Sequence, residues 1–582
     1  MSTQLRRARQ RQMVIFLLVC VGLIVLSCRL YYWQVIDGPP LARAANAEHT
    51  EVQTVNAPRG LIYDSHGMLL ATNIIRDDVY VEPAQIVTDY PDTYQEQRNK
   101  LALQLHQVLS TLPVATLLQE LASNLPTQRI AIKITENQSQ QLQALHLPYT
   151  FLEPRTWRDY PNSDLASQVL GYVEANQENE SPQGVYGIEE KYNAVLAGKA
   201  GSLTAETDLN GNPLTVGASS AQPAVPGSDL TLTLDSTIQY TVQTALEQRV
   251  KEMQAESGTA VVLNARTGAV VAMAGYPSFD PNNYSQYADQ RGCRGALSVY
   301  FNPAMYCAYE PGSTMKAVTM AAALDQKVIT PNTSFDDNGQ LTFTDGTPAV
   351  HNWANLAYGT ETMTQVLQHS ANVGAAWVAT RKLGSSRFYP YLQRFDFGQP
   401  TGIFGPEASG IYNTPSNPNW SPSDLARESF GQGISVTPLQ MARVYQAIAD
   451  DGTLMKPYIV SSITGNGHTT ITQPQVERQV VSANAAHQLT GMLVQTAAYE
   501  HIAVPGYSIA IKTGTATNQS LADTNTDASM AGFIPASNPQ YVILVKLDHP
   551  QTSIYGGTAA GPLWEKIAQQ LMWRYGVPPD AA

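Results

Sequence analysis

Hydrophobic residues follow three patterns along this chain, and each predicts a different kind of element. Residues 13–32 form a nearly unbroken apolar run. At about 1.5 Å per residue, roughly 20 helical residues span a bilayer core of about 30 Å. Farther along, short β-like runs predict strands, and one of them, 229–234, alternates between apolar and polar residues with period two. Longer segments with helical periodicity predict helices. The pattern predicts a membrane anchor followed by a large folded part.

The residues that flank the apolar run predict its orientation. A cluster of positive charge precedes the run and consists of Arg6, Arg7, Arg9 and Arg11. Because positive flanks stay in the cytoplasm, we expect a cytoplasmic tail at 1–12, a transmembrane helix at 13–32 and the rest of the chain outside the cytoplasm. Tyr31, Tyr32 and Trp33 suit the aromatic belt at a membrane interface.

Two forms of processing compete with an uncleaved anchor. A signal peptide would be cut at the small residues of 42–44 or 45–47, but both sites lie well beyond the run, which is itself longer than a typical signal core of 7–15 residues. A lipoprotein site at Cys28 would have the bulky Leu26 in front of it. We therefore expect the anchor to remain in the mature protein.

The patterns beyond the anchor predict two modules. The first, 33–226, is mixed, with a helical tract near 96–125, and ends in a Gly/Ala/Pro-rich linker at 216–227. The second, 227–582, has strand patterns at both ends of a helical middle. These strands are expected at 229–234, 259–264, 269–274, 507–511, 529–534 and 540–547, with helices at 236–255 and 561–575. The order predicts an α+β fold with one antiparallel sheet completed from both ends.

Composition narrows the function. A net charge of −13 excludes a broad basic face for nucleic acid, and 43% hydrophobic residues with 14% charged residues indicate well-packed domains. Cys293 and Cys307 lie in the second module, where a disulfide and two free thiols are equally open interpretations. No Cys or His residues have zinc-site spacing, so we expect neither a metal nor a cofactor.

The segment 310–316 carries the most informative chemical pattern. Pro311-Gly312 predicts a turn, and the apolar residues 313–324 predict a buried helix that begins near Ser313. Ser313 and Lys316 are three residues apart and share one helix face. Because burial disfavours an ammonium ion, a neutral Lys316 can take the serine's proton. The Ser-x-x-Lys pattern alone is a weak signal, since it arises often by chance.

Two further segments carry candidate chemistry. Ser370-Ala371-Asn372, in a helical stretch at 363–383, offers a hydroxyl and an amide that can pass protons and hold a substrate amide. A second copy of this pattern begins at Ser482, where a helix N-cap is the better interpretation. The third segment follows the strand pattern at 507–511. Its cation and hydroxyls could bind a carboxylate; the alternative interpretation is a surface lysine before a turn. It consists of Lys512, Thr513, Gly514 and Thr515, in which the glycine would let a substrate backbone approach closely.

The three motifs occur in the order Ser-x-x-Lys, Ser-x-Asn, Lys-Thr-Gly, which is the set of penicillin-binding proteins and β-lactamases. The middle motif here is Ser-Ala-Asn, not Ser-Asp-Asn. The N-terminal module adds Arg-Gly-Leu-Ile-Tyr-Asp at 59–64 and Leu-Ala-Thr-Asn at 70–73. Over nearly its whole length the chain resembles class B penicillin-binding proteins. The segments 531–536, 555–557 and 576–579 look more like septal, cell-division members than elongation members.

The resemblance implies a fold and an activity. A serine β-lactamase-like transpeptidase domain, with a five-stranded antiparallel sheet and a helical subdomain, would follow an elongated, non-catalytic, dimerisation-type pedestal. Ser313 would be acylated by the D-Ala-D-Ala end of a peptidoglycan stem peptide, and an amine of a second stem would then take the acyl group. β-Lactams would acylate the same serine. A membrane glycosyltransferase and other division proteins are the implied partners.

The resemblance also assigns residue roles. Lys316 would be the base, Ser370 and Asn372 would assist proton transfer and hold the peptide, and the strand 512–515 would grip the donor carboxylate. Backbone N–H groups of Ser313 and Thr515 would form an oxyanion hole. The alternatives are a D,D-carboxypeptidase, an elongation-type transpeptidase and a non-catalytic division scaffold. A glycosyltransferase-bearing class A protein does not fit, because the segment 59–73 occupies the place of that domain.

Overall fold

A computed structural model of the chain describes residues 2–41, 50–175, 181–206, 219–343, 346, 348–517 and 526–581. The described residues form two compact units. One comprises Met1–Pro58 with Gly198–Pro226, and the other comprises Arg59–Ala197 with Gly227–Ala582. Candidate chemistry lies entirely in the second unit.

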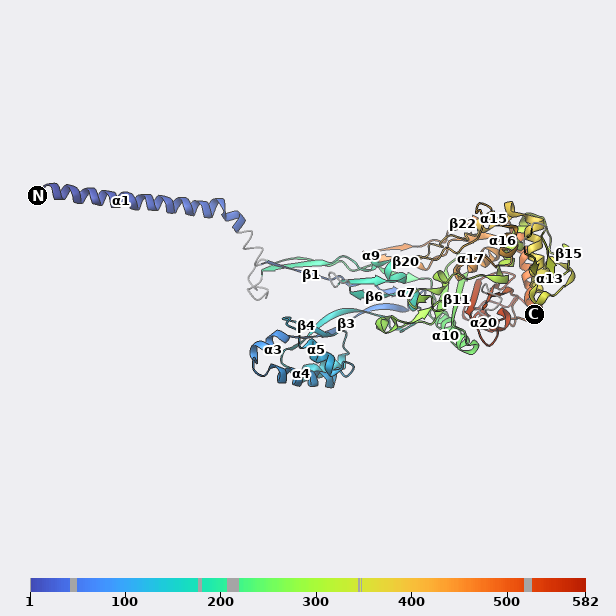
Figure 1. Ribbon diagram of the computed structural model, residues 1–582, viewed down its shortest axis with the longest axis horizontal. Coiled ribbons are helices and arrows are strands. Elements are labelled where there is room, and N and C mark those ends of the chain that lie inside the picture. Colours follow the sequence, from blue (N-terminus) through green and yellow to red (C-terminus); the bar gives the residue numbers. More distant parts are fainter. Residues whose placement is uncertain are drawn as a thin grey trace. The chain divides into compact units, whose positions relative to one another are not determined.

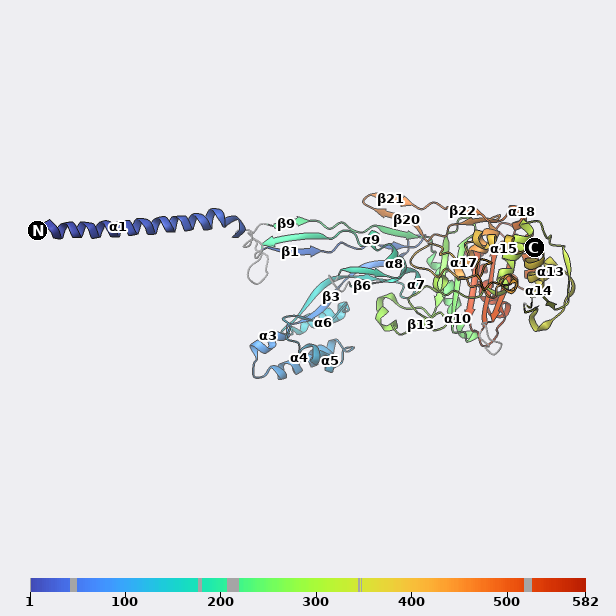
Figure 2. The same ribbon diagram turned by 45° about the horizontal axis from the view of Figure 1, so that its top comes forward.

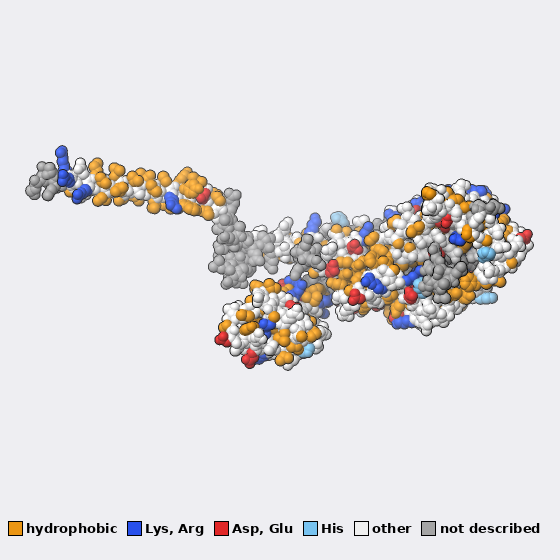
Figure 3. All heavy atoms as spheres, viewed as in Figure 1, with side chains coloured by type: hydrophobic (Ala, Val, Ile, Leu, Met, Phe, Trp, Pro, Cys, Tyr) orange, Lys and Arg blue, Asp and Glu red, His pale blue; other side chains and the backbone are white. Residues whose placement is uncertain are grey.

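The first unit contains the apolar anchor. Helix α1 (Ser2–Tyr31) continues into the π-helical turn η1 (Tyr32–Ile36), so the helix begins before the expected span 13–32 and takes in the arginine cluster. Within the described part of the chain, one helix, Arg6–Ile36, is long and apolar enough to cross a membrane. Figure 3 shows its hydrophobic side chains exposed along the helix, with basic side chains at the N-terminal end.

A small sheet completes the first unit. Its strands are β1 (Thr50–Val55), β8 (Gly201–Glu206) and β9 (Ser219–Gln222), joined in the order β1-β8-β9 with antiparallel pairing. The described part of the expected linker 216–227 therefore contains a strand. The Gly/Ala/Pro-rich composition predicted a linker here and not a strand. Strand β9 is held by backbone pairing to β8, so it does not need a pattern of alternating apolar residues.

A second sheet of the larger unit joins strands that are far apart in the sequence. Strand β10 pairs in parallel with β2 and antiparallel with β20, so strands from both sequence segments of the unit share one sheet. The order is β21-β20-β10-β2-β3-β4, with β5 also on β3. The bounds are β2 Ile62–Tyr63, β3 Leu69–Val81, β4 Gln128–Ala131, β5 Thr150–Asp159, β10 Asp229–Leu232, β20 Val460–Gly465 and β21 His468–Ile471.

Helices pack at the β4 end of this sheet around their own apolar core. They are α3 (Pro83–Asp89), α4 (Tyr94–Val108), α5 (Val114–Glu120) and α6 (Glu136–Leu145). The expected helical tract 96–125 is therefore two helices. Pro113 separates them, because proline cannot continue the preceding helix but suits the residue before a new one.

A buried ion cluster ties the N-terminal part of this unit together. Glu189 lies on the short helix α8 (Gly187–Lys191) and is fully buried. Its Oε2 accepts a hydrogen bond of 2.7 Å from Arg59 Nε, and its Oε1 accepts one of 2.7 Å from Arg158 Nε. Both guanidinium groups are almost completely buried, so the carboxylate neutralises charge that would otherwise lack a partner.

The central sheet has five antiparallel strands in the order β12-β11-β25-β24-β23. Figures 1 and 2 show strands surrounded by helices in the C-terminal part of the chain. The strands are β11 (Ser257–Asn264), β12 (Val270–Tyr276), β23 (Ala510–Thr517), β24 (Thr526–Ile534) and β25 (Tyr541–Asp548). This order confirms the expected sheet that is completed from both ends of its module. Almost every residue of β11, β24 and β25 is buried, because helices cover both faces.

The covering helices fall into two layers. Helices α10 (Ser236–Met253) and α20 (Gly561–Arg574) share one apolar core with one face of the sheet. Helices α12 (Lys316–Asp325), α17 (Pro438–Ala449) and α18 (Ala483–Tyr499) belong to the core on the other face. Together with the smaller helices of the middle region, this arrangement confirms the expected α+β fold with a helical subdomain.

Cys293 and Cys307 form a disulfide. This settles the alternatives that the sequence left open. The side chain of Arg294, next to Cys293, forms ion pairs with Asp527 on β24 and Asp548 on β25. The bridged loop is therefore anchored on two strands of the central sheet.

Candidate active site

The nucleophile segment is a tight turn followed by a buried helix. A 3-10 turn, Gly312–Met315, leads into α12, in which residues 316–324 are all buried. Gly312 has φ +54°, and its N–H donates to Gly431 O at 3.0 Å. A Cβ on Gly431 would lie 2.1 Å from Gly312 O, so only glycine permits the two backbones to meet. This contact fixes the turn that carries Ser313.

Lys316 connects the first two motifs. Its Nζ lies 2.9 Å from Ser313 Oγ and 2.9 Å from Asn372 Oδ1. It also contacts the carbonyl oxygen of Ser370 and lies 3.3 Å from Ser370 Oγ. A neutral amine has two N–H donors and one lone pair. With the donors directed at the Ser370 carbonyl and the Asn372 amide oxygen, the lone pair is left for the hydroxyl of Ser313.

The Ser-Ala-Asn motif lies at a break between helices. The expected helix 363–383 is interrupted: α13 (Met363–Gln368) ends before Ser370, which has φ +54°, and α14 (Asn372–Trp377) begins after it. The break turns the carbonyl of Ser370 toward Lys316, which a continuous helix would have directed along its own axis. At the second copy, Ser482 accepts a hydrogen bond from Ala485 N as the N-cap of α18, which confirms the simpler interpretation.

Burial determines the charge state of Lys316. The side chain is fully buried, and burial together with the nearby Lys512 cation holds the pKa of this lysine well below its ordinary value. Glu361 and Glu500 act in the opposite direction, but more weakly. The net effect favours the neutral amine, which is the form able to accept a proton.

The third motif lies on strand β23, at the edge of the central sheet. The strand begins at Ala510 and contains Lys512–Thr515, so the expected strand 507–511 is placed too early. Successive side chains alternate between the faces of a strand, and Thr513 and Thr515 both line the pocket. Lys512 is fully buried; its Nζ pairs with Glu500 Oε1 at 3.1 Å.

Gly514 has a packing role that the sequence did not suggest. A Cβ at this position would lie 2.5 Å from Ser529 Oγ and 2.9 Å from Pro311 O. The nucleophile turn therefore lies directly over β23 at the glycine. Close approach is the reason for a glycine here, as expected, but in this structure the approaching backbone is that of the protein itself.

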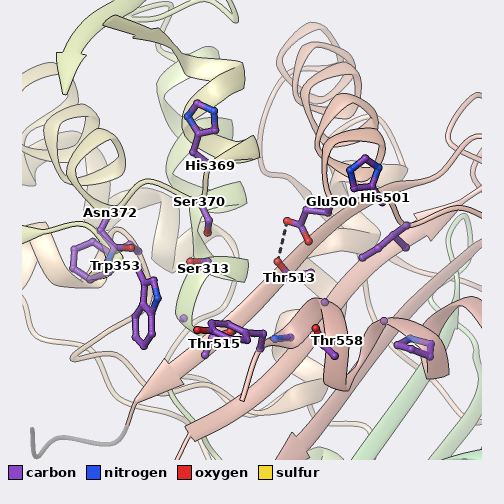
Figure 4. A pocket seen from close by; sticks show the side chains of 18 of the residues that line it. Ser313, Trp353, His369, Ser370, Asn372, Glu500, His501, Thr513, Thr515 and Thr558 are labelled. Atoms are coloured by element: carbon purple, nitrogen blue, oxygen red, sulfur yellow. Dashed lines mark hydrogen bonds between the residues drawn. The ribbon is translucent and has the colours of Figure 1, made fainter. Parts of the chain in front are cut away.

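A cavity of about 580 Å³ brings the motifs together (Figure 4). Ser313, Ser370 and Asn372 line one side, and Thr513 and Thr515 line the strand side. All three motifs thus face one cleft, although they are far apart in the sequence. Its remaining lining includes aromatic and acidic side chains, among them Trp353, Tyr358, Tyr555, Glu500 and Glu565.

Sequence reasoning missed two acidic groups at this site. Glu500 follows α18 and accepts a 2.9 Å hydrogen bond from Thr513 Oγ1. Glu361 lies behind the Ser-Ala-Asn motif, with its Oε2 2.9 Å from Nδ1 of the pocket residue His369. Burial, reinforced by Asp337, raises the pKa of Glu361 to about 8. Neither glutamate belongs to a motif. Tertiary packing places Glu500 in the lining of the cleft and Glu361 in the buried layer behind it.

Among the described residues, one group has the donor types and spacing for a metal ion: Asp64, His66 and Asp235. Both carboxylates are already engaged. Asp64 accepts hydrogen bonds from the backbone N–H groups of His66, Met68 and Ser236, and Asp235 caps α10. The group therefore has a structural explanation, and the expected lack of a metal stays a prediction.

Comparison with known proteins identifies the family. The model of the penicillin-binding protein transpeptidase domain matches residues 258–572, and the model of the penicillin-binding protein dimerisation domain matches residues 54–232. The chain is a class B penicillin-binding protein. This assignment confirms the family that the three motifs indicated.

Similar class B penicillin-binding proteins span almost the whole chain. The sequence is 30% identical to stage V sporulation protein D of Bacillus subtilis, over 98% of this chain and 86% of that protein. It is 28% identical to the peptidoglycan D,D-transpeptidase FtsI of Escherichia coli, over 97% of this chain and 92% of the relative. These relatives confirm the expected likeness to the septal type.

A solved structure supports the same assignment. Penicillin-binding protein 3 of Mycobacterium tuberculosis, solved in complex with aztreonam, is 28% identical and aligns with a TM-score of 0.66 over 90% of this chain and 98% of that chain. Penicillin-binding protein 2X of Streptococcus thermophilus, 24% identical with a TM-score of 0.71, shares the fold.

Proposed function

We propose that this protein is a membrane-anchored D,D-transpeptidase that cross-links peptidoglycan stem peptides through an acyl-enzyme on Ser313, in septal wall synthesis during cell division. The observation that carries the proposal is the 2.9 Å contact between Lys316 Nζ and Ser313 Oγ in a cleft that also contains the other two motifs. The family assignment and the named D,D-transpeptidase relatives support the substrate class.

The first half-reaction forms the acyl-enzyme. Lys316, as a neutral amine, takes the proton of Ser313, whose Oγ attacks the carbonyl carbon of the penultimate D-Ala. The bond from this carbon to the nitrogen of the last D-Ala breaks. The departing nitrogen receives a proton through Lys316 and Ser370, which lie within hydrogen-bond reach of each other. Backbone N–H groups of Ser313 and Thr515 stabilise the oxyanion.

The second half-reaction transfers the acyl group. The amine of a second stem peptide attacks the ester carbonyl, a new amide bond forms, and the ester bond to Ser313 breaks. The proton lost by the amine returns to Ser313 Oγ through Lys316. Asn372, held at 2.9 Å from Lys316 Nζ, keeps the base in place and offers its amide to the peptide. In the first half-reaction, before the last D-Ala leaves, Thr513 and Thr515 bind its terminal carboxylate.

The proposed organisation of the chain follows from the anchor and the family. Residues 1–12 lie in the cytoplasm, 13–32 span the membrane, 33–226 form the non-catalytic pedestal and 227–582 form the transpeptidase domain outside the cytoplasm. The arginine cluster before the apolar helix supports this orientation. A membrane glycosyltransferase and other division proteins are the proposed partners.

Labelling with a fluorescent penicillin tests the function. The full-length protein in detergent should form a stable covalent adduct, and Ser313→Ala should form none. Separate, unlabelled samples of the wild type are assayed for transfer with a D-Ala-D-Ala donor, with and without an amine acceptor. Amide product supports transpeptidation, whereas hydrolysis alone would indicate a carboxypeptidase. If the wild type does not react with the penicillin, the non-catalytic division scaffold is the remaining interpretation.

A further inference from the structure

Glu500 occupies a position in the cleft where a negative charge is unexpected. It is the C-cap residue of α18, and Figure 4 shows its carboxylate directed at Thr513 in the pocket. Oε1 accepts a hydrogen bond from Thr513 Oγ1 at 2.9 Å and one from Lys512 Nζ at 3.1 Å. Both partners belong to the motif assigned to the carboxylate of the donor peptide. The carboxylate of Glu500 therefore holds two of the donor groups that this motif would offer to a ligand carboxylate.

A ligand carboxylate and Glu500 compete for the same donors. The hydroxyl of Thr513 has one hydrogen, and this hydrogen cannot be given to both carboxylates at once. Two carboxylates close together also repel each other, since like charges oppose the ionised forms. The side chain of Glu500 is 16% exposed, whereas Lys512 is fully buried. The glutamate thus lies on the solvent side of the pair, on the path of an entering ligand.

We propose that Glu500 is a specificity-determining residue that opposes the entry of carboxylate-bearing ligands at the Thr513 end of the cleft. The inference rests on the proposed function, because it takes the donor's carboxylate to bind at Thr513. Donor peptides and β-lactams that carry a carboxylate must displace Glu500 from the Thr513 hydroxyl before they are positioned for Ser313. Acylation by such ligands is slower than the motif residues alone would permit.

The second outcome of the test corresponds to the opposite role, in which Glu500 supports acylation by holding Lys512 in place. Glu500 neutralises a fully buried lysine, and loss of such a partner leaves an uncompensated charge. If the main role of Glu500 were to hold Lys512 charged and in position, its removal would slow acylation. The two roles therefore predict changes of opposite sign.

The experiment measures the second-order rate constant for acylation by benzylpenicillin, which carries one carboxylate, with the full-length protein in detergent. Glu500→Gln keeps an oxygen acceptor for Thr513 and Lys512 but removes the charge. The rate should rise about 3- to 10-fold, the size expected for one partly exposed charge. Glu500→Asp, which keeps the charge, should not be faster than the wild type.

Glu565→Gln is the matched control. It removes the same charge from another glutamate of the cavity lining, one that accepts a hydrogen bond from Ala503 N. If both Gln variants speed acylation equally, the increase comes from the general loss of negative charge in the cavity. The proposal of a local competition at Thr513 is then wrong. The advantage of Glu500→Gln over the wild type should also shrink as salt rises, because exposed charges are screened.

An unchanged or lower rate for Glu500→Gln overturns the proposal. Glu500→Ala, which also removes the charge, provides a second variant if the first does not fold, as judged by its thermal unfolding midpoint. Failure of this inference is distinguishable from failure of the proposed function. In the former case the wild type still forms an adduct that Ser313→Ala lacks; in the latter neither protein forms one.

Discussion

The amine of Lys316 and the hydroxyl of Ser313 lie 2.9 Å apart at the start of α12, and Lys316 is fully buried. The lysine is the first residue of an apolar helix, and packing of this helix fixes its position. Exclusion of solvent lowers its pKa and so favours the neutral amine. The nearest cation, Lys512, acts on it in the same direction as burial does. The pair therefore combines a nucleophile with a base in one turn of chain.

The rate of acylation should depend on pH through Lys316. The pKa of this lysine is lowered by burial and by Lys512, so the neutral, active amine exists well below the ordinary pKa of 10.5. We expect the penicillin acylation rate to fall as pH drops through the lowered pKa. Lys316→Met should reduce the rate by at least about 10³-fold. A rate that stays low until the pH nears 10.5 would contradict the neutral base.

Glu428 should make folding stability depend on pH. It ends α16 (Pro422–Glu428), it is fully buried, and burial raises its pKa to about 8. Because the folded protein holds the proton more tightly than the unfolded chain, this contribution is complete below about pH 4.5 and is lost as pH rises through about 8. Glu428→Gln should flatten the fall of the unfolding midpoint between these values. An equally steep fall in the variant would assign the dependence to other groups.

The Arg59–Glu189–Arg158 cluster should be sensitive to loss of its carboxylate. Glu189→Ala leaves two buried guanidinium groups unpaired, and we expect the free energy of unfolding to fall by about 3–5 kcal/mol. Glu247→Ala is the control, since Glu247 forms an exposed pair with Lys251 that solvent screens, and its loss should change the free energy of unfolding little. Chemical denaturation of the full-length protein measures both. Similar losses in the two variants would show that burial does not matter here.

The Cys293–Cys307 disulfide should stabilise the transpeptidase module. For a sequence separation of 14 residues, the entropy of the unfolded chain predicts a loss of about 3 kcal/mol when the bond is removed. Cys293→Ser combined with Cys307→Ser should lower the unfolding midpoint, and a reductant should have the same effect on the wild type only. Alkylation of the denatured, unreduced protein should modify Cys20 and Cys28 and leave the other two cysteines unmodified.

The sequence predicted those parts of the fold that depend on local pattern. Short runs of β-type apolar residues placed the strands β11, β24 and β25 within a few residues, and the apolar run after Ser313 identified α12 as buried. The strand β9 and the true start of β23 were missed, because backbone pairing with β8 and β24 decides them. The break at Ser370 was missed as well, since its residues have ordinary helical propensity.

The site was predictable where a motif carried it. Lys316 lies within hydrogen-bond distance of both Ser313 and Asn372. The sequence predicted this meeting only because the order of the motifs resembles that of a known family. Glu500 is different: it is separated from Lys512 by 12 residues, and no periodic pattern connects them. Its contact arises because the end of α18 packs against β23, which is a property of the tertiary fold and not of any local segment.

The strand order of the central sheet has a consequence for biosynthesis. Strand β11, near the start of the module, has β25 as its neighbour, and β25 lies between it and β24. A ribosome makes β25 long after it has made Ser313, because this strand comprises residues 541–548. Until then the nascent module has a gap in the middle of its sheet, so a chain that ends before residue 541 holds its nucleophile but lacks the strand that joins β11 to β24.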